Sequence, residues 1–214
     1  MIQHLATEQV TFLLKQPDMQ TPSGRRDVTL LSLLYDTGAR VQEICDLRVR
    51  DVRLEHPALV TLTGKGRKTR HVPLLTNTAN LLKAYMLENN MFQNGKQDMP
   101  LFHNQRRNAL TRRGISHILK KYTVNQQNAD TPPKTVTPHM LRHSKAMHLL
   151  KAGVNIVYIR DILGHASIQT TEMYARVDME TKRKVLENAY PSITPENLPE
   201  WNKDKNLLDF LKNL

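Results

Sequence analysis

His139 and Arg142 stand three residues apart in a segment that has the signals of a helix start. Thr137 is a favourable N-cap residue, and Pro138 suits the first helical position. At this spacing both side chains lie on one helix face, which continues inward through Ala146. An arginine at the edge of an apolar face is costly unless a negative group meets it, and a helix N-terminus also attracts anions. The segment predicts anion binding, although an internal salt bridge explains Arg142 slightly better when the segment is taken alone.

His139 and His143 are four residues apart, a spacing that zinc peptidases use for two metal ligands. Those enzymes need a glutamate directly after the first histidine as general base, and Met140 stands in that place here. Arg142 would also put a positive charge beside the cation. We therefore predict no metal at this pair.

Three further features carry residue types that do chemistry. Tyr174 follows the triplet Leu163-Gly164-His165 by nine residues, but a phenol with a pKa of about 10 is a poor nucleophile without help. Arg40 has Glu43 one helical turn later. Lys65 lies between two glycines at the tip of a basic hairpin, in a turn that lacks the P-loop pattern.

Taken together, these residues resemble the catalytic set of the tyrosine recombinase (phage integrase) family in type, order and spacing. The set comprises Arg40, Lys65, His139, Arg142, His165 and Tyr174. The surrounding segments Thr37-Gly38-Ala39-Arg40-Val41-Gln42-Glu43-Ile44, His139-Met140-Leu141-Arg142-His143-Ser144 and Leu163-Gly164-His165 resemble the family's sequence boxes. The similarity extends from about residue 7 to 190, which is nearly the whole chain.

The resemblance implies a site-specific DNA recombinase or integrase, of the kind that bacterial mobile elements carry. Such an enzyme cleaves and rejoins strands through a covalent 3′-phosphotyrosine, here on Tyr174. Arg40 and Arg142 would clamp the phosphate oxygens, because a guanidinium is always charged and donates two parallel hydrogen bonds. Lys65 would protonate the leaving 5′ oxygen.

The remaining roles follow from the same resemblance. His139 would act as the base or proton shuttle for Tyr174, and His165 as a donor to the phosphate. Glu43 would support the site without touching DNA. The phosphotyrosine keeps the energy of the broken linkage, so we predict no ATP, no metal and no other cofactor.

The charge of the chain favours a polyanionic partner. Lys and Arg number 31 and Asp and Glu 20, a net charge of +11, while aromatic residues make up only 5%. Duplex phosphates fit this composition better than stacked single-stranded bases. We expect Arg67, Lys68 and Arg70 to follow the DNA backbone, and Arg112 and Arg113 to reach phosphates or the major groove.

The elements that must position these residues are mostly helical. We expect helices over 8–15, 25–36, 40–47, 76–89, 113–123, 137–151, 155–162, 168–175 and 179–189. Short strands are expected around Val52, over 59–62 and over 71–74. The fold class predicted is therefore α+β, mostly α-helical, with a small three-stranded antiparallel sheet at one side.

We assign residues 1–190 to the catalytic domain and 191–214 to a linker and an apolar C-terminal helix. This helix either docks into a neighbouring protomer in a DNA-bound tetramer, as the resemblance implies, or folds back on its own domain. In solution we expect a monomer. The family's N-terminal core-binding domain is absent, so the chain is either a natural short form or a fragment.

The location predicted is the cytoplasm, associated with the bacterial nucleoid. No apolar run approaches the ~20 residues that cross a bilayer, and the first residues lack the layout of a signal peptide. The single cysteine, Cys45, excludes an intrachain disulfide, and we interpret it as a small buried apolar side chain.

Three other functions compete with recombination. A type IB topoisomerase shares the tyrosine, both arginines and the lysine, but His139 is characteristic of recombinases. A catalytically silent DNA-binding module would be expected to have lost at least one residue of the set. A metal-dependent nuclease would need a carboxylate cluster, which the sequence does not display.

Overall fold

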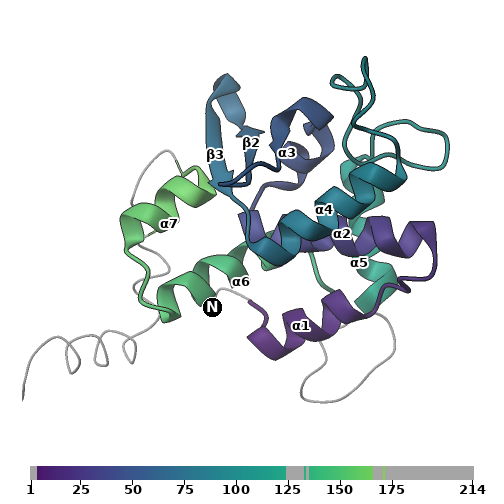
Figure 1. The fold of residues 1–214 in the computed structure, drawn as a ribbon. Helices are drawn as coiled ribbons and strands as arrows, with labels where there is room; N and C mark the ends of the chain where they lie inside the picture. Colours follow the sequence, from purple (N-terminus) through teal and green to yellow (C-terminus); the bar gives the residue numbers. More distant parts are fainter. Residues whose placement is uncertain (1–3, 124–132, 134, 166–170, 172–214) are drawn as a thin grey trace, which may run out of the picture. The chain divides into compact units, whose positions relative to one another are not determined.

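The structure of the chain is a computed structural model that describes residues 4–123, 133, 135–165 and 171. These residues all fall within one compact unit, Met1–Asp178. Figure 1 shows the helices packed around one another with the strands beside them. The helices are α1 (Thr7–Lys15), α2 (Pro22–Thr37), α3 (Val41–Asp46), α4 (Thr76–Glu88), α5 (Arg112–Thr123), α6 (Pro138–Lys151) and α7 (Ile156–Leu163), and two short 3-10 turns are η1 (Val49–Asp51) and η2 (Lys65–Arg67).

Helix α2 lies at the centre of the described unit and packs against α1, α4 and α6 (Figure 1). Its start is capped by the Thr21 hydroxyl, which accepts a hydrogen bond from the Gly24 amide at 3.0 Å. Its apolar residues are buried all around the helix, as Leu30, Leu31, Leu33 and Leu34 show. A helix that is apolar on every side belongs inside the core, and this one ends there at a left-handed glycine, Gly38.

The three strands form one antiparallel sheet in the order β1 (Val52–Arg53), β2 (Leu59–Thr63) and β3 (Thr69–Pro73). Val60 pairs with Val72, and Leu62 with Arg70. Val60, Leu62 and Val72 are buried, so alternate residues of β2 and β3 face the core. Arg70 lies on the same face as Val72, because it is two residues away in the strand.

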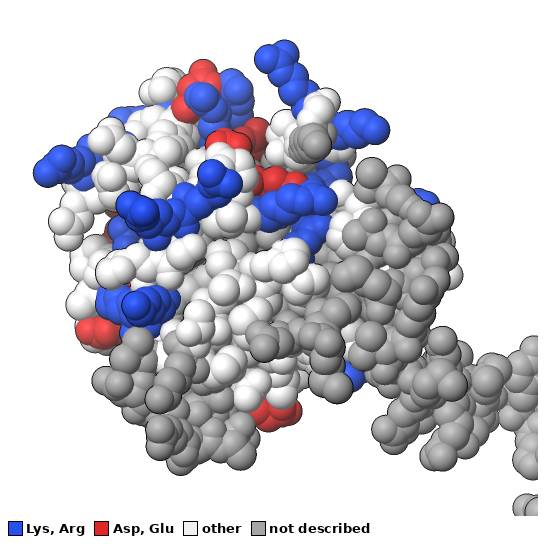
Figure 2. All heavy atoms as spheres, turned by 180° about the vertical axis from the view of Figure 1, so that it is seen from behind, with Lys and Arg blue, Asp and Glu red and all other residues white. Residues whose placement is uncertain are grey.

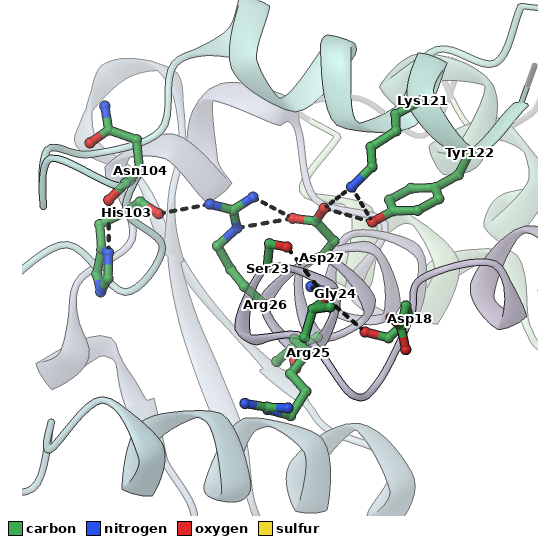
Figure 3. Close-up of polar contacts among 12 residues, drawn as sticks. Asp18, Ser23, Gly24, Arg25, Arg26, Asp27, His103, Asn104, Lys121 and Tyr122 are labelled. Carbon is green, nitrogen blue, oxygen red and sulfur yellow. Dashed lines mark hydrogen bonds and ion pairs between the residues drawn. The ribbon is translucent and has the colours of Figure 1, made fainter.

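A buried carboxylate joins the centre of the fold to α5. The Asp27 side chain, 1% exposed, accepts hydrogen bonds from the Arg26 guanidinium and from the Tyr122 hydroxyl (Figure 3). Arg26 also donates to the carbonyl oxygen of His103 at 3.3 Å, and Lys121 lies 3.7 Å from Asp27. A buried charge needs such partners, and those of Asp27 come from α2 and α5, while Arg26 extends the network to the segment that precedes α5.

The mostly helical α+β fold with a three-stranded antiparallel sheet, predicted from the sequence, is confirmed. Two helix starts differ from the prediction: α1 begins at Thr7 rather than at residue 8, with Ala6 as its N-cap, and α3 begins at Val41 rather than at residue 40, with Arg40 as its N-cap. The helices predicted over 168–175, of which only Thr171 is described, over 179–189 and at the C-terminus otherwise lie outside the described residues. Within the described part of the chain, no helix has the length and apolarity needed to cross a membrane.

Candidate active site

Arg142 connects the ends of two helices. Helix α6 begins as predicted, with Pro138 as its first residue and the Thr137 hydroxyl accepting from the Met140 amide. One turn later the Arg142 side chain is buried, and it donates to the carbonyl oxygens of Gly38 at 2.6 Å and of Leu163 at 2.7 Å. These carbonyls lie at the C-terminal ends of α2 and α7, where helix dipoles favour a cation.

His165 follows directly after the end of α7. Gly164 closes that helix in the left-handed conformation, with a φ of 65°, and the His165 amide donates back to the carbonyl of Arg160. The imidazole is half-buried, and its Nδ1 lies 2.8 Å from the Thr171 hydroxyl. Burial, with the positive charges of Arg142, Arg40 and Arg70, lowers the pKa of His165 to about 4.

Arg40 is held at the start of α3 by Glu43. Its amide donates to one carboxylate oxygen at 2.7 Å, and its guanidinium to the other at 3.1 Å. The Arg40 side chain is 45% exposed, whereas that of Glu43 is 3% exposed. Burial alone would raise the pKa of Glu43, but the hydrogen bonds and charges of Arg70 and Arg40 outweigh it and keep that pKa below its usual value.

Arg70 does not lie where we predicted it. The sequence places it in a basic hairpin that follows the DNA backbone, yet its side chain is only 12% exposed and forms a bidentate pair with Glu43 at 2.8 Å. Its position on the inward face of β3 is the physical reason, since residues 70 and 72 point the same way. In this geometry the guanidinium is engaged by Glu43 rather than presented at the surface, and the contact of Arg70 with DNA stays a prediction.

Three arginines converge on the last residues of α7. Arg70 donates to the carbonyl of Ile162 at 2.8 Å, Arg142 to that of Leu163 at 2.7 Å, and Arg40 to that of Gly164 at 3.3 Å. The three carbonyls are consecutive in the chain and belong to the turn that carries His165. Arg40, Arg142 and His165 are predicted catalytic residues, so the structure brings these parts of the set together.

His139 is placed differently from Arg142. Its side chain is exposed in the first turn of α6, although we predicted that both would share an inward face. Its ring meets that of His143 edge-on, with 4.0 Å between centroids. Burial and the neighbouring His139 and Arg142 lower the pKa of His143 to about 4. No group of three or more His, Cys, Asp or Glu side chains in the described residues is arranged to bind a metal ion.

The other predicted DNA contacts are exposed. Arg67 and Lys68 lie at the hairpin tip, which the Gly64 amide closes by donating to the carbonyl of Lys68 at 2.8 Å. Arg112 and Arg113 are exposed in the first turn of α5, as predicted. Figure 2 shows Lys and Arg side chains spread over much of one face of the molecule, with fewer Asp and Glu among them.

Two predicted catalytic groups are not placed by the structure. Tyr174 lies outside the described residues. Lys65 begins the turn η2, but its side chain also lies outside what the structure describes. Thr171, three residues before Tyr174, is described, and its contact with His165 fixes one point between α7 and that tyrosine.

The buried position of Arg70 against Glu43 is the feature of the site that sequence reasoning missed. The signal that could have found it is the two-residue period of the strand, because Val72 is an apolar residue in a predicted strand and Arg70 must share its face. A charged residue on an inward face predicts a buried acidic partner. Glu43 is the acidic residue that the same sequence had already placed beside Arg40.

Known proteins match this chain over most of its length. The phage integrase family matches residues 3–181 of the chain. The tyrosine recombinase XerD of Staphylococcus epidermidis is 40% identical over 189 residues, covering 87% of this chain and 62% of that protein. The tyrosine recombinase XerC of Bacillus subtilis is 37% identical over 188 residues, covering 86% and 60%. The chain thus spans about six tenths of the length of these curated relatives.

Solved structures give the same result. The XerA recombinase matches with a TM-score of 0.72 and 27% identity, over 89% of this chain and 66% of that one. The XerH recombinase, solved with its palindromic difH substrate after cleavage, matches with a TM-score of 0.66 and 26% identity. The match covers 86% of this chain and 52% of that one. The catalytic domain of bacteriophage HP1 integrase, 21% identical with a TM-score of 0.58, supports the fold, and it is covered over its whole length. Fold, site and sequence agree, and the chain belongs to the phage integrase family, that of the tyrosine recombinases.

Proposed function

We propose that the chain cleaves and rejoins DNA strands in site-specific recombination, through a 3′-phosphotyrosine formed on Tyr174. The observation that carries this proposal is the convergence of Arg40, Arg142 and His165 on the turn that ends α7. The relatives named tyrosine recombinases support this activity, and so does the XerH site-specific recombinase that was solved with its palindromic difH substrate.

The two arginines supply the positive charge that the transition state needs. When Tyr174 attacks the phosphorus, negative charge grows on the non-bridging oxygens of a five-coordinate phosphate. Arg40 and Arg142 are tied to consecutive carbonyls, so their guanidinium groups are oriented before DNA arrives. Preorganised donors of this kind are usually the largest catalytic factor, and removing one costs about 10²–10³ in rate.

Protons move through the histidines and Lys65. The lowered pKa of His165 favours the neutral imidazole in the unbound protein, and its Nδ1 lies 2.8 Å from the Thr171 hydroxyl. We assign the donation to the phosphate to the other ring nitrogen, Nε2. An incoming phosphate raises the pKa of His165, because it adds negative charge beside a half-buried imidazole. His139 takes the proton of Tyr174, and Lys65 gives one to the leaving 5′ oxygen. No step requires ATP, a metal or another cofactor.

Duplex DNA is the partner in this proposal. Arg67 and Lys68 contact the backbone from the hairpin, and Arg112 and Arg113 contact phosphates or the major groove from α5. All four side chains are exposed, and the chain carries a net charge of +11. Binding through phosphates must weaken as salt rises.

Assembly on DNA completes the proposal. The chain is a monomer in solution and forms a tetramer on DNA, joined by the C-terminal helix at about residues 207–214. Recombination needs two duplexes and four cleaved strands, so four copies of the nucleophile are required. The charge repulsion between protomers at +11 each favours separation until DNA neutralises them.

The test uses a nicked duplex whose cleavage releases a short fragment and so traps the covalent intermediate. Its sequence is selected from a random pool by binding to the full chain, and the reaction contains EDTA. We expect a protein–DNA adduct on a denaturing gel with the wild-type chain and none with Tyr174→Phe. Both proteins should bind the duplex equally.

The other outcomes separate the rival functions. Binding without an adduct would overturn the proposal in favour of a silent DNA-binding module. Cleavage that appears only when a divalent cation is added would support a nuclease. An adduct followed by relaxation of supercoiled DNA, with no strand exchange between duplexes, would indicate a type IB topoisomerase.

A further inference from the structure

Arg70 is enclosed between the sheet and α7. It lies on β3 opposite Leu62 and on the same face as the buried Val72, and strand β3 packs against α7. Its side chain is 12% exposed, compared with 45% for Arg40. An arginine in this position is not directed at solvent or at a ligand on the surface.

Its first partner is the carboxylate of Glu43. The two terminal nitrogens of Arg70 lie 2.8 Å from one Glu43 oxygen each. With the two bonds from Arg40, the carboxylate accepts four hydrogen bonds. A 3% exposed carboxylate is stable only with such partners, and removing one leaves buried charge uncompensated.

Its second partner is α7. The Nε of Arg70 donates to the carbonyl of Ile162 at 2.8 Å, next to the carbonyls that bind Arg142 and Arg40. One guanidinium therefore connects the carboxylate that orients Arg40 with the turn that presents His165. These two parts of the site lie more than a hundred residues apart in the sequence.

Gly164 makes room for this connection. A Cβ atom at that position would lie 2.8 Å from Nη1 of Arg70, closer than real Cβ contacts come. The residue also has a φ of 65°, which glycine adopts without strain. The glycine of the Leu163-Gly164-His165 triplet thus serves both the helix end and the packing of Arg70.

We propose that Arg70 is a positioning residue, which holds the Arg40–Glu43 pair and the His165 turn in register without touching DNA. The inference rests on the proposed strand cleavage, because its main readout is the rate of that reaction. A lysine cannot replace Arg70, since one ammonium cannot span both Glu43 oxygens and the Ile162 carbonyl.

The experiment compares Arg70→Lys and Arg70→Gln with Arg67→Ala, a matched loss of one arginine from the exposed hairpin tip. We expect both Arg70 variants to bind DNA as the wild type does but to cleave the nicked duplex ~10²-fold more slowly, because the site is displaced. Arg67→Ala, at a residue proposed to contact the DNA backbone, should lose affinity, and this loss marks what the removal of a DNA contact looks like. Thermal unfolding establishes which variants are folded. If Arg70→Gln does not fold, Arg70→Lys, which keeps the positive charge beside Glu43, serves as the test variant.

A pH profile separates positioning from a general loss of structure. Arg70 holds the pKa of Glu43 down and contributes to the lowered pKa of His165. In Arg70→Gln the pKa of Glu43 rises, and a protonated Glu43 no longer holds the Arg40 guanidinium as a carboxylate does. Cleavage should therefore begin to fail at a higher pH than in the wild type as the solution is acidified. A purely structural defect would reduce the rate equally across the pH range.

A double variant tests the route through the carboxylate. If Arg70 acts through Glu43, then Arg70→Gln combined with Glu43→Gln should cleave no more slowly than Glu43→Gln alone. Wild-type rates and pH profiles in the Arg70 variants would overturn the inference, as would a loss of affinity matching that of Arg67→Ala. If the wild-type chain forms no adduct, the proposed function fails instead, and the two failures are distinguishable.

Discussion

Arg142 donates a hydrogen bond of 2.7 Å to the main-chain carbonyl of Leu163, the residue that ends α7. The same guanidinium binds the carbonyl that follows α2, at Gly38. An arginine proposed to clamp phosphate is therefore also a structural link between two helix ends. This double use means that its loss affects stability and chemistry at once.

We expect Arg142→Ala to be destabilised as well as inactive. Removing the guanidinium takes away a buried hydrogen-bond donor from the carbonyls of Gly38 and Leu163. Each unsatisfied buried group lowers the free energy of unfolding by about 1–3 kcal/mol. Urea unfolding should report this as a lower midpoint, whereas Tyr174→Phe should match the wild type. A variant as stable as the wild type would show that these two bonds contribute nothing.

Gly164→Ala should be more damaging than Gly153→Ala. Both glycines have a positive φ, of 65° and 77°, so both substitutions carry the left-handed cost of about 1–2 kcal/mol. Only Gly164 has Arg70 within 3 Å of the added methyl, while the space around Gly153 is open. Thermal unfolding of the two variants isolates this contact, and equal melting temperatures would contradict it.

The protein should lose stability as the pH falls from 6.5 toward 4. The folded pKa values of His143 and His165 are about 4, below the 6.5 of an unfolded histidine. Between these pH values the unfolded chain binds more protons than the folded chain, so acid favours unfolding. The stability of the folded protein with both histidines neutral is therefore fully present only above pH 6.5. Melting temperatures measured from pH 7.5 to 4.5 should decline, and less steeply in His143→Gln. A melting temperature that does not change with pH would show that both imidazoles are protonated as easily in the folded protein as in the unfolded chain.

Cys45 should be unreactive in the folded protein. Its side chain is 9% exposed, and burial raises the pKa of the thiol, so little thiolate is available. A thiol reagent at pH 8 should label no site in the native chain and one site after denaturation, since the chain has one cysteine. Rapid labelling under native conditions would mean that α3 opens readily.

The sequence predicted the elements well because their signals are local. Thr137 and Pro138 mark the start of α6, and the glycines 38 and 164 mark the ends of α2 and α7. The buried Cys45 was likewise readable from its apolar neighbours. Each of these features depends on residues within one or two turns.

The contacts across the site were not predictable in the same way. The sequence favoured an internal carboxylate as the partner of Arg142, but the structure shows main-chain carbonyls in that role. Since every residue has a carbonyl, the residue types do not indicate which ones bind Arg142. The Arg70–Glu43 pair joins residues 27 apart, from a strand and a helix, and nothing local specifies it. His139 is exposed because it lies in the first turn of α6, beyond the edge of the core.

The proposed strand cleavage is tested most directly by identifying the residue that becomes covalently joined to DNA. The covalent adduct from the nicked duplex is digested with protease and nuclease, and the nucleotide-bearing peptide is identified by mass spectrometry. We predict one modified peptide, in which Tyr174 is linked to the 3′-phosphate of the cleaved strand, and a new 5′-hydroxyl end on the released strand. A linkage to any other residue, or a 5′-phosphate linkage, would contradict it.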